Sequence, residues 1–190
     1  MSRPFRYDAY QACYCEENAW HLCGDRRLRT KPRAAVWVSN ADKTVAFAGH
    51  RAGSPLVVWD YHVVVAVGTD DGWTIYDPDS VLPGGVALEE WIEVCFGRPP
   101  RMGKMFAPRF RVVEADAFRA SFRSDRSHMR LRNGHYRSPP PPWPTIGDGG
   151  TNLWDFASMN GSGPGRLARL GDLPRVLDAV VGARQSSNAP

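Results

Sequence analysis

The chain has 190 residues, of which 43% are hydrophobic and 23% are charged, and its formal net charge is +4. This length is enough for one domain with a substantial buried core, so we expect a single domain over 1–190 with flexible ends at 1–9 and 183–190. The first residues contain no apolar signal region, and no apolar run reaches the roughly 20 residues of a membrane span. We therefore expect a cytoplasmic protein with no membrane partner, whose four cysteines stay reduced.

The basic residues are interleaved with acidic ones along most of the chain. Nucleic-acid-binding proteins normally carry a clustered basic stripe, so this distribution predicts a solvated surface and no nucleic-acid partner. We also expect the protein to be a monomer.

The first predicted element is a helix over 15–24. Glu16 and Glu17 suit its first turn, where the backbone dipoles favour negative charge, and Gly24 is a typical stop. Cys15 then lies at or near the N-cap, where the open backbone N–H groups favour a thiolate, although the two glutamates oppose that effect. A short strand is predicted over 34–39.

A long strand is predicted over 56–67, and its apolar residues fall on both faces, as in a strand buried at the centre of a sheet. The polar exceptions are Asp60 and His62. Because side chains alternate along a strand, these two are expected to share a face. Buried polar groups need partners, so the sequence predicts that both are paired.

A hairpin is predicted next, because Asp71-Gly72 is a turn signal and a return strand follows over 73–77. Loop length leaves three registers open, which place His62 opposite Val81, Asp79 or Asp77. Asp77 points to the same face as His62 in all three. The register therefore permits a contact between Asp77 and His62 in each case.

The rest of the chain is predicted to alternate between short helices, one strand and a long irregular segment. Helices are expected over 89–96, 116–122, 152–159 and 167–181, a strand over 110–114, and irregular structure over 124–150. Together with the hairpin, these elements predict an α+β fold with a mainly antiparallel sheet.

Cys15, His62 and Asp77 form the residue set that thiol acyl-transfer chemistry needs. A sulfur nucleophile requires an imidazole within hydrogen-bond reach, and a third group that orients the imidazole. Asp79 could replace Asp77 as that third group. The Cys15 amide is the candidate for one oxyanion donor. The chain order of nucleophile, histidine and acid is that of the papain and transglutaminase group of α+β folds, an argument by analogy.

Cys15, His62 and Asp77 lie in the first three of seven segments that follow one another over roughly residues 10–177, namely Cys13 to Asn18, Trp59 to Val63, Ile75 to Asp79, Phe110 to Val113, Ser124 to Met129, Pro139 to Pro142 and Asn152 to Phe156. In these segments the chain resembles the protein N-terminal glutamine amidohydrolases. The resemblance implies a substrate, namely proteins or peptides with a free N-terminal glutamine. Their side-chain carboxamide would be converted to glutamate with loss of ammonia.

That substrate would bring an α-ammonium group to the site, and a carboxylate is its natural partner. We expect this partner to be Asp60, Glu16 or Glu17. No cofactor and no metal are expected. His128 is a further imidazole in a matching segment, and the sequence allows it to line the substrate site or to anchor a loop.

Two alternatives remain open from the sequence. A transglutaminase or a peptidase would use the same three residues on another substrate. A zinc-binding module could instead use four residues near the predicted helix, Cys13, Cys15, His21 and Cys23. Their spacing is poor for this purpose, because it sends the ligands to different faces of the helix.

Overall fold

The computed structural model describes residues 5–97 and 103–187, with side chains up to residue 182. The predicted flexible ends therefore lie partly outside the described residues, at 1–4 and 188–190, and the side chains of 183–187 lie outside them as well. Within the N-terminal stretch, the Phe5 ring packs edge-to-face against Tyr76, with 4.8 Å between the ring centroids.

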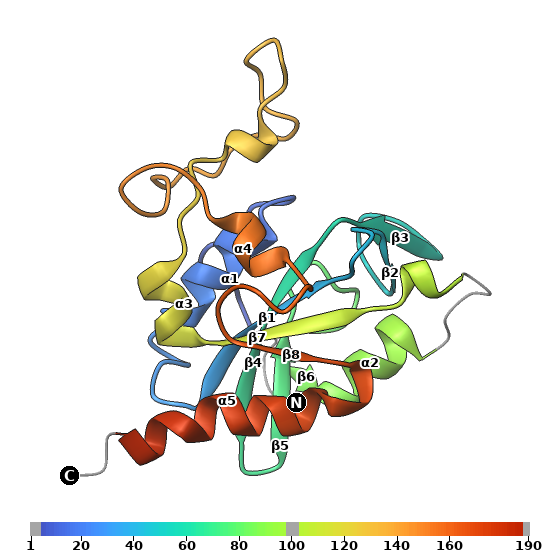
Figure 1. Ribbon diagram of the computed structural model, residues 1–190, viewed down its shortest axis with the longest axis vertical. Coiled ribbons are helices and arrows are strands. Elements are labelled where there is room, and N and C mark those ends of the chain that lie inside the picture. Colours follow the sequence, from blue (N-terminus) through green and yellow to red (C-terminus); the bar gives the residue numbers. More distant parts are fainter. Residues whose placement is uncertain (1–4, 98–102, 188–190) are drawn as a thin grey trace.

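A six-stranded antiparallel sheet forms the centre of the fold, in the order β6-β5-β4-β1-β7-β8 (Figure 1). Its strands are β1 (Arg33–Ser39), β4 (His62–Thr69), β5 (Gly72–Tyr76), β6 (Val86–Ala87), β7 (Arg109–Glu114) and β8 (Arg166–Ala168). A second, two-stranded sheet pairs β2 (Val45–Ala48) with β3 (Leu56–Trp59). The predicted α+β class with a mainly antiparallel sheet is confirmed.

Helices cover both faces of the central sheet (Figure 1). On β1, Ala34 and Val36 belong to one core cluster and Ala35 and Trp37 to the other, as the alternation of side chains along a strand requires. The cluster of Val36 includes residues of α2 (Leu88–Phe96) and α5 (Leu173–Ser187). The cluster of Trp37 includes residues of α1 (Cys15–Cys23), α3 (Ala115–Ser121) and α4 (Leu153–Ala157). The sheet is therefore the middle of three layers.

The prediction of one long strand over 56–67 is wrong, because the chain changes sheets at Asp60 and Tyr61. β3 pairs with β2, whereas β4 begins at His62 and pairs with β1. At the break, the Ser39 hydroxyl donates to the Asp60 carbonyl and the Tyr61 N–H donates to Asp60 Oδ1. These bonds satisfy backbone groups that a continuous ladder would otherwise pair. Asp60 and His62 therefore do not share the face of one strand.

The hairpin between β4 and β5 adopts one of the three predicted registers. Thr69 pairs with Gly72, and the ladder continues to the pair of Val65 and Tyr76. Extended along the strands, this register brings His62 level with Asp79, and Asp77 lies on the turn of the chain just after β5.

The predicted helix over 167–181 begins later than expected. The segment Arg166–Ala168 is strand β8, paired with β7, and a 3-10 turn over Leu170–Asp172 precedes α5. Leu167 and Ala168 are apolar in a pattern that a helix or an edge strand can equally use. The long-range pairing with β7 decides between the two.

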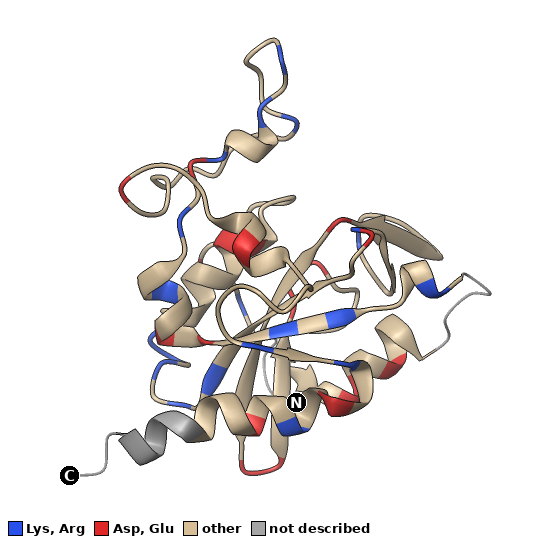
Figure 2. Cartoon of the chain, in the orientation of Figure 1, with Lys and Arg blue, Asp and Glu red and all other residues tan. Residues whose placement is uncertain are grey.

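The predicted irregular segment over 124–150 contains a 3-10 turn, Ser127–Met129, and isolated bridges such as that between Arg130 and Tyr136. Part of it projects from the body of the protein (Figure 1). Figure 2 shows Lys and Arg on strands, helices and this projecting segment alike. Within the described ranges, none of the helices combines the length and apolar character needed to cross a bilayer.

Candidate active site

Cys15 is the first residue of α1, close to its predicted position. Tyr14 is the N-cap and gives no side-chain cap, so the first N–H groups of the helix are open. The entry to the helix is held by Asn18, whose side chain accepts from the Gln11 N–H and donates to the Gln11 carbonyl, each at 2.8 Å. These bonds fix the direction from which the chain reaches the half-buried thiol.

His62 and Asp77 form a buried pair. His62 Nε2 lies 3.0 Å from Asp77 Oδ1, and both side chains are almost fully buried. Asp77 also accepts from the Trp91 indole and from the Asp79 N–H, so its carboxylate is held on both oxygens. The contact between His62 and Asp77, which all three predicted hairpin registers permit, is therefore present in the structure.

The charges of the pair shift both pKa values in opposite directions. Burial alone would lower the pKa of His62, but the Asp77 carboxylate and its hydrogen bond outweigh burial and raise that pKa above its ordinary value. Burial alone would raise the pKa of Asp77, but the His62 charge, the His62 hydrogen bond and the Trp91 donor lower it. The Asp77 carboxylate therefore stabilises the imidazolium that forms when His62 accepts a proton.

The Cys15 thiol does not have the lowered pKa that a helix start alone would favour. Burial and then the Glu16 carboxylate raise its pKa well above the ordinary value, and the Val63 N–H that donates to the sulfur opposes them. Glu16 Oε2 lies only 3.7 Å from the sulfur. At neutral pH the resting residue is therefore a thiol, and its proton must be removed during any attack by the sulfur.

Cys15 and His62 line one cavity of about 460 Å³. Other side chains of its wall come from distant parts of the chain, namely Tyr10, His50, Arg51, Trp59, Asp60, Asp79, His128, Arg137 and Trp154. Asp77 is not part of the wall and lies behind His62. The cavity therefore brings two of the three predicted catalytic residues together, with the third in contact with the second.

The three predicted partners of a substrate ammonium lie in different places. Asp60 is exposed and lines the cavity. Glu16 is fully buried beside the sulfur, and its carboxylate accepts from the Tyr61 hydroxyl at 3.1 Å and lies 3.4 Å from His128 Nε2. Glu17 is also fully buried, but it is bonded to Arg126 and does not line the cavity. The position of Asp60 fits contact with a substrate, whereas that of Glu17 does not.

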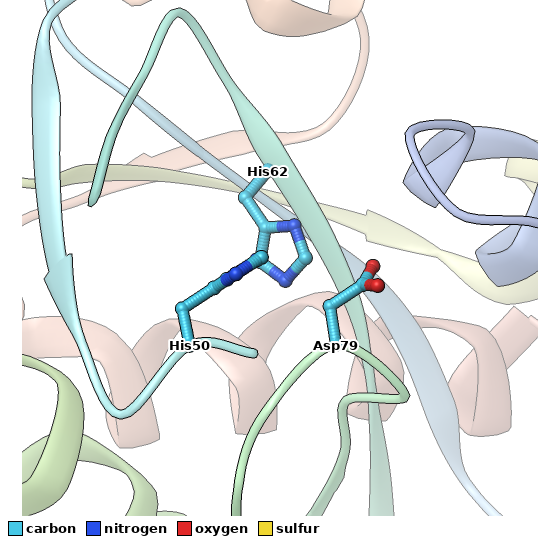
Figure 3. A group of neighbouring side chains, drawn as sticks. All are labelled: His50, His62 and Asp79. Atoms are coloured by element: carbon cyan, nitrogen blue, oxygen red, sulfur yellow. The ribbon is translucent and has the colours of Figure 1, made fainter. Parts of the chain in front are cut away.

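The four residues of the alternative zinc module are not brought together. Cys13 is exposed, Cys23 is fully buried, and the His21 ring packs edge-to-face on Trp143. Within the part of the chain that the structure describes, a different group of three possible metal ligands lies close together: His50, His62 and Asp79 (Figure 3).

Sequence reasoning missed His50, which follows β2 and enters the wall of the cavity. No periodic pattern or motif surrounds it in the sequence, so no local signal could have found it. His128, for which the sequence allows a place at the substrate site, lines the cavity. Tyr61 was recognised only as part of a motif, although its hydroxyl contacts the Glu16 carboxylate beside the nucleophile.

The cavity joins a cysteine at a helix start to a histidine that is paired with a carboxylate. Enzymes that use a sulfur nucleophile are built on this set of residues. A family model described as N-terminal glutamine amidase matches residues 10–177. The chain belongs to this family.

Named relatives agree with the family match. Protein N-terminal glutamine amidohydrolase of Homo sapiens is 39% identical over 160 residues, covering 80% of this chain and 78% of that protein. The protein of the same name from Bos taurus is also 39% identical, with 80% and 77% covered. That from Drosophila mojavensis is 36% identical over 177 residues, with 86% and 85% covered. The resemblance seen in the motifs is thus confirmed along most of the chain.

Proposed function

We propose that this protein deamidates the side chain of an N-terminal glutamine to glutamate and releases ammonia. Its family and the printed names of its relatives support this activity. The observation that carries the proposal is the buried pair of His62 and Asp77 in contact with the cavity that Cys15 lines. Cys15 is the proposed nucleophile, His62 the general acid and base, and Asp77 the group that orients the ring.

The first half-reaction forms a thioester. His62 takes the proton of the Cys15 thiol as the sulfur attacks the carboxamide carbon, and then gives that proton to the departing nitrogen, so that ammonia leaves. Since Nε2 is bonded to Asp77, Nδ1 is the ring nitrogen left for the sulfur. Asp77 stabilises the imidazolium that forms between the two proton transfers.

The second half-reaction hydrolyses the thioester and regenerates the free enzyme. His62 takes a proton from water, the resulting hydroxide attacks the thioester carbon, and the proton returns to the Cys15 sulfur as the glutamate product leaves. The open N–H groups at the start of α1, including that of Cys15, are the proposed donors to the oxyanion of both steps.

Asp60 is the proposed partner of the substrate α-ammonium, because it is the exposed carboxylate of the three and lines the cavity. Glu16 is the second choice, since it lies beside the nucleophile but is fully buried. The protein is proposed to act as a cytoplasmic monomer, without a cofactor and on proteins or peptides that begin with glutamine.

Ammonia release from a glutamine-first peptide tests the proposal. The peptide should be turned over, and the same peptide with an acetylated amine should not. A transglutaminase would instead join the peptide to an added amine, and a peptidase would cut its backbone. Either product without free ammonia would refute the proposed reaction.

The nucleophile is tested with two cysteine variants. Cys15→Ser should abolish turnover in a folded protein, while Cys13→Ser, at an exposed thiol of the same segment, should keep most of it. The reverse result would move the nucleophile to Cys13.

A further inference from the structure

His50, His62 and Asp79 lie on three separate segments and meet at one wall of the cavity (Figure 3). Each offers one possible ligand atom, and these atoms lie within 4.8 Å of one another. All three side chains are buried, with relative exposures of 8%, 2% and 7%. Two imidazoles and a carboxylate are a donor set that suits zinc, which takes three protein ligands and leaves a fourth position open in many sites.

The backbone holds the segments of His50 and Asp79 together. The Arg51 N–H donates to the Asp79 carbonyl and the Val81 N–H to the Gly49 carbonyl, each at 2.8 Å. His50 and Ser80 form a bridge between these bonds. The two donors therefore come from one fixed unit and do not depend on the folding of a mobile loop.

The side chains are also oriented. The Tyr10 hydroxyl donates to Asp79 Oδ1 at 2.7 Å, and the His50 ring packs against the rings of Trp59 and His62. In Figure 3 the His50 ring and the Asp79 carboxylate lie on either side of the His62 ring. A zinc ion bound about 2.0–2.2 Å from each donor would draw the three together by modest side-chain rotations.

We propose that His50, His62 and Asp79 form a zinc-binding site whose occupation blocks the reaction of Cys15. Its binding half stands on the geometry alone, and its inhibitory half rests on the proposed function. Catalysis uses both ring nitrogens of His62, because Nε2 bonds Asp77 and Nδ1 is left for the sulfur. Zinc therefore takes a nitrogen that catalysis needs, whichever of the two it binds. Zinc and turnover therefore exclude each other.

Zinc binding also breaks existing bonds. The Ala52 N–H donates to His50 Nδ1, so a proton must move or leave when this ring coordinates through its other nitrogen. If zinc takes Nε2 of His62, the bond to Asp77 is lost as well. These losses make the site one for reversible binding, from which a chelator removes zinc, and not one for a resident cofactor.

The binding half is tested by calorimetric titration of zinc chloride into the full-length Cys15→Ser protein. One zinc should bind per chain, because the sulfur is not one of the three ligands. Adding His50→Gln should weaken binding by at least about 10–100-fold, because even the loss of a group that only orients a ligand typically has this effect. Asp79→Asn in the same background gives a second ligand variant. The matched control is His135→Gln, at an exposed histidine outside the cavity, which should change nothing.

The inhibitory half is tested in the ammonia assay with buffered zinc. Zinc should stop the native enzyme, and a chelator should restore it. The His50→Gln enzyme should turn over without zinc and need at least about 10–100 times more zinc for inhibition.

Loss of all zinc binding in the Cys15→Ser protein would assign zinc to a chelate that uses the Cys15 sulfur, and would overturn the proposed site. Zinc binding with the same affinity with and without His50→Gln and Asp79→Asn would place the ion elsewhere in the protein, and would overturn the site as well. A protein that binds zinc in calorimetry but releases no ammonia would refute the proposed function and leave the binding site standing.

Discussion

Glu17 and Arg126 are 109 positions apart in the sequence and form a buried, two-pronged ion pair, with Nε 2.9 Å from Oε1 and Nη2 2.8 Å from Oε2. The Trp143 indole and the Ser124 hydroxyl donate to the same carboxylate. Arg126 also donates to backbone carbonyls of the segment that follows, including that of Trp143. The pair therefore fastens the helix that begins at Cys15 to the irregular segment over 124–150, which supplies His128 to the cavity wall.

Replacing Arg126 should destabilise the fold. Arg126→Met leaves the fully buried Glu17 carboxylate without its cation, and loss of one partner of a buried pair typically costs about 3–5 kcal/mol. Urea unfolding measures this change. Arg132→Met, at an exposed arginine of the same segment, is the control and should stay within about 0.5 kcal/mol of the native protein. Equal stability of the two variants would contradict the assigned importance of the pair.

We expect Asp77, and not Asp79, to orient the His62 ring. Asp77→Asn keeps the shape of the side chain but loses the charge that stabilises the imidazolium, so turnover should fall by roughly two to four orders of magnitude. Asp79→Asn should reduce turnover far less, because the Asp79 carboxylate binds the Tyr10 hydroxyl and has no hydrogen bond to His62. Steady-state ammonia release compares the two, and a larger loss in Asp79→Asn would reverse the assignment.

The parts of the site that could be predicted from sequence are those governed by local rules. The helix start at Cys15 follows from its acidic first turn, whereas strand parity and a short hairpin only permit the contact of His62 with Asp77 and do not choose it over Asp79. The change of sheet at Asp60 escaped prediction, because its apolar neighbours satisfy two separate sheets as well as one strand.

The long-range partners could not be found in this way. Arg126 and Glu17 each look like solvated surface charges in the sequence, and only the path of the chain between them buries the pair. His50 reaches the cavity because the Arg51 N–H bonds to the Asp79 carbonyl, a contact with no sequence pattern. Such contacts depend on tertiary packing and not on the periodicity of one segment.

Removing the charge of Glu16 should make Cys15 ionise more easily. After burial, this carboxylate is the largest cause that raises the thiol pKa, so Glu16→Gln should lower the pKa from its raised position. For each unit by which the thiol pKa falls, the fraction of thiolate at a fixed neutral pH rises about tenfold. The rate of alkylation by iodoacetamide, followed as pH rises, reports the thiolate. Glu90→Gln, at an exposed glutamate on α2, should leave the profile in place, and an unmoved profile in Glu16→Gln would remove Glu16 from the causes of the shift.

Asp60→Asn should weaken substrate binding with little effect on the chemical step. The asparagine keeps an oxygen for the Tyr61 N–H but loses the charge proposed to bind the α-ammonium. Hydrogen bonds to charged groups contribute about 1.5–3 kcal/mol, which corresponds to a rise in KM of roughly 10–100-fold. Separate KM and kcat values for a glutamine-first peptide test this, with Asp70→Asn at the exposed hairpin turn as the control. A fall in kcat at constant KM would show that Asp60 acts on the reacting atoms, and native values of both would leave Glu16, the other carboxylate near the nucleophile, as the partner of the ammonium.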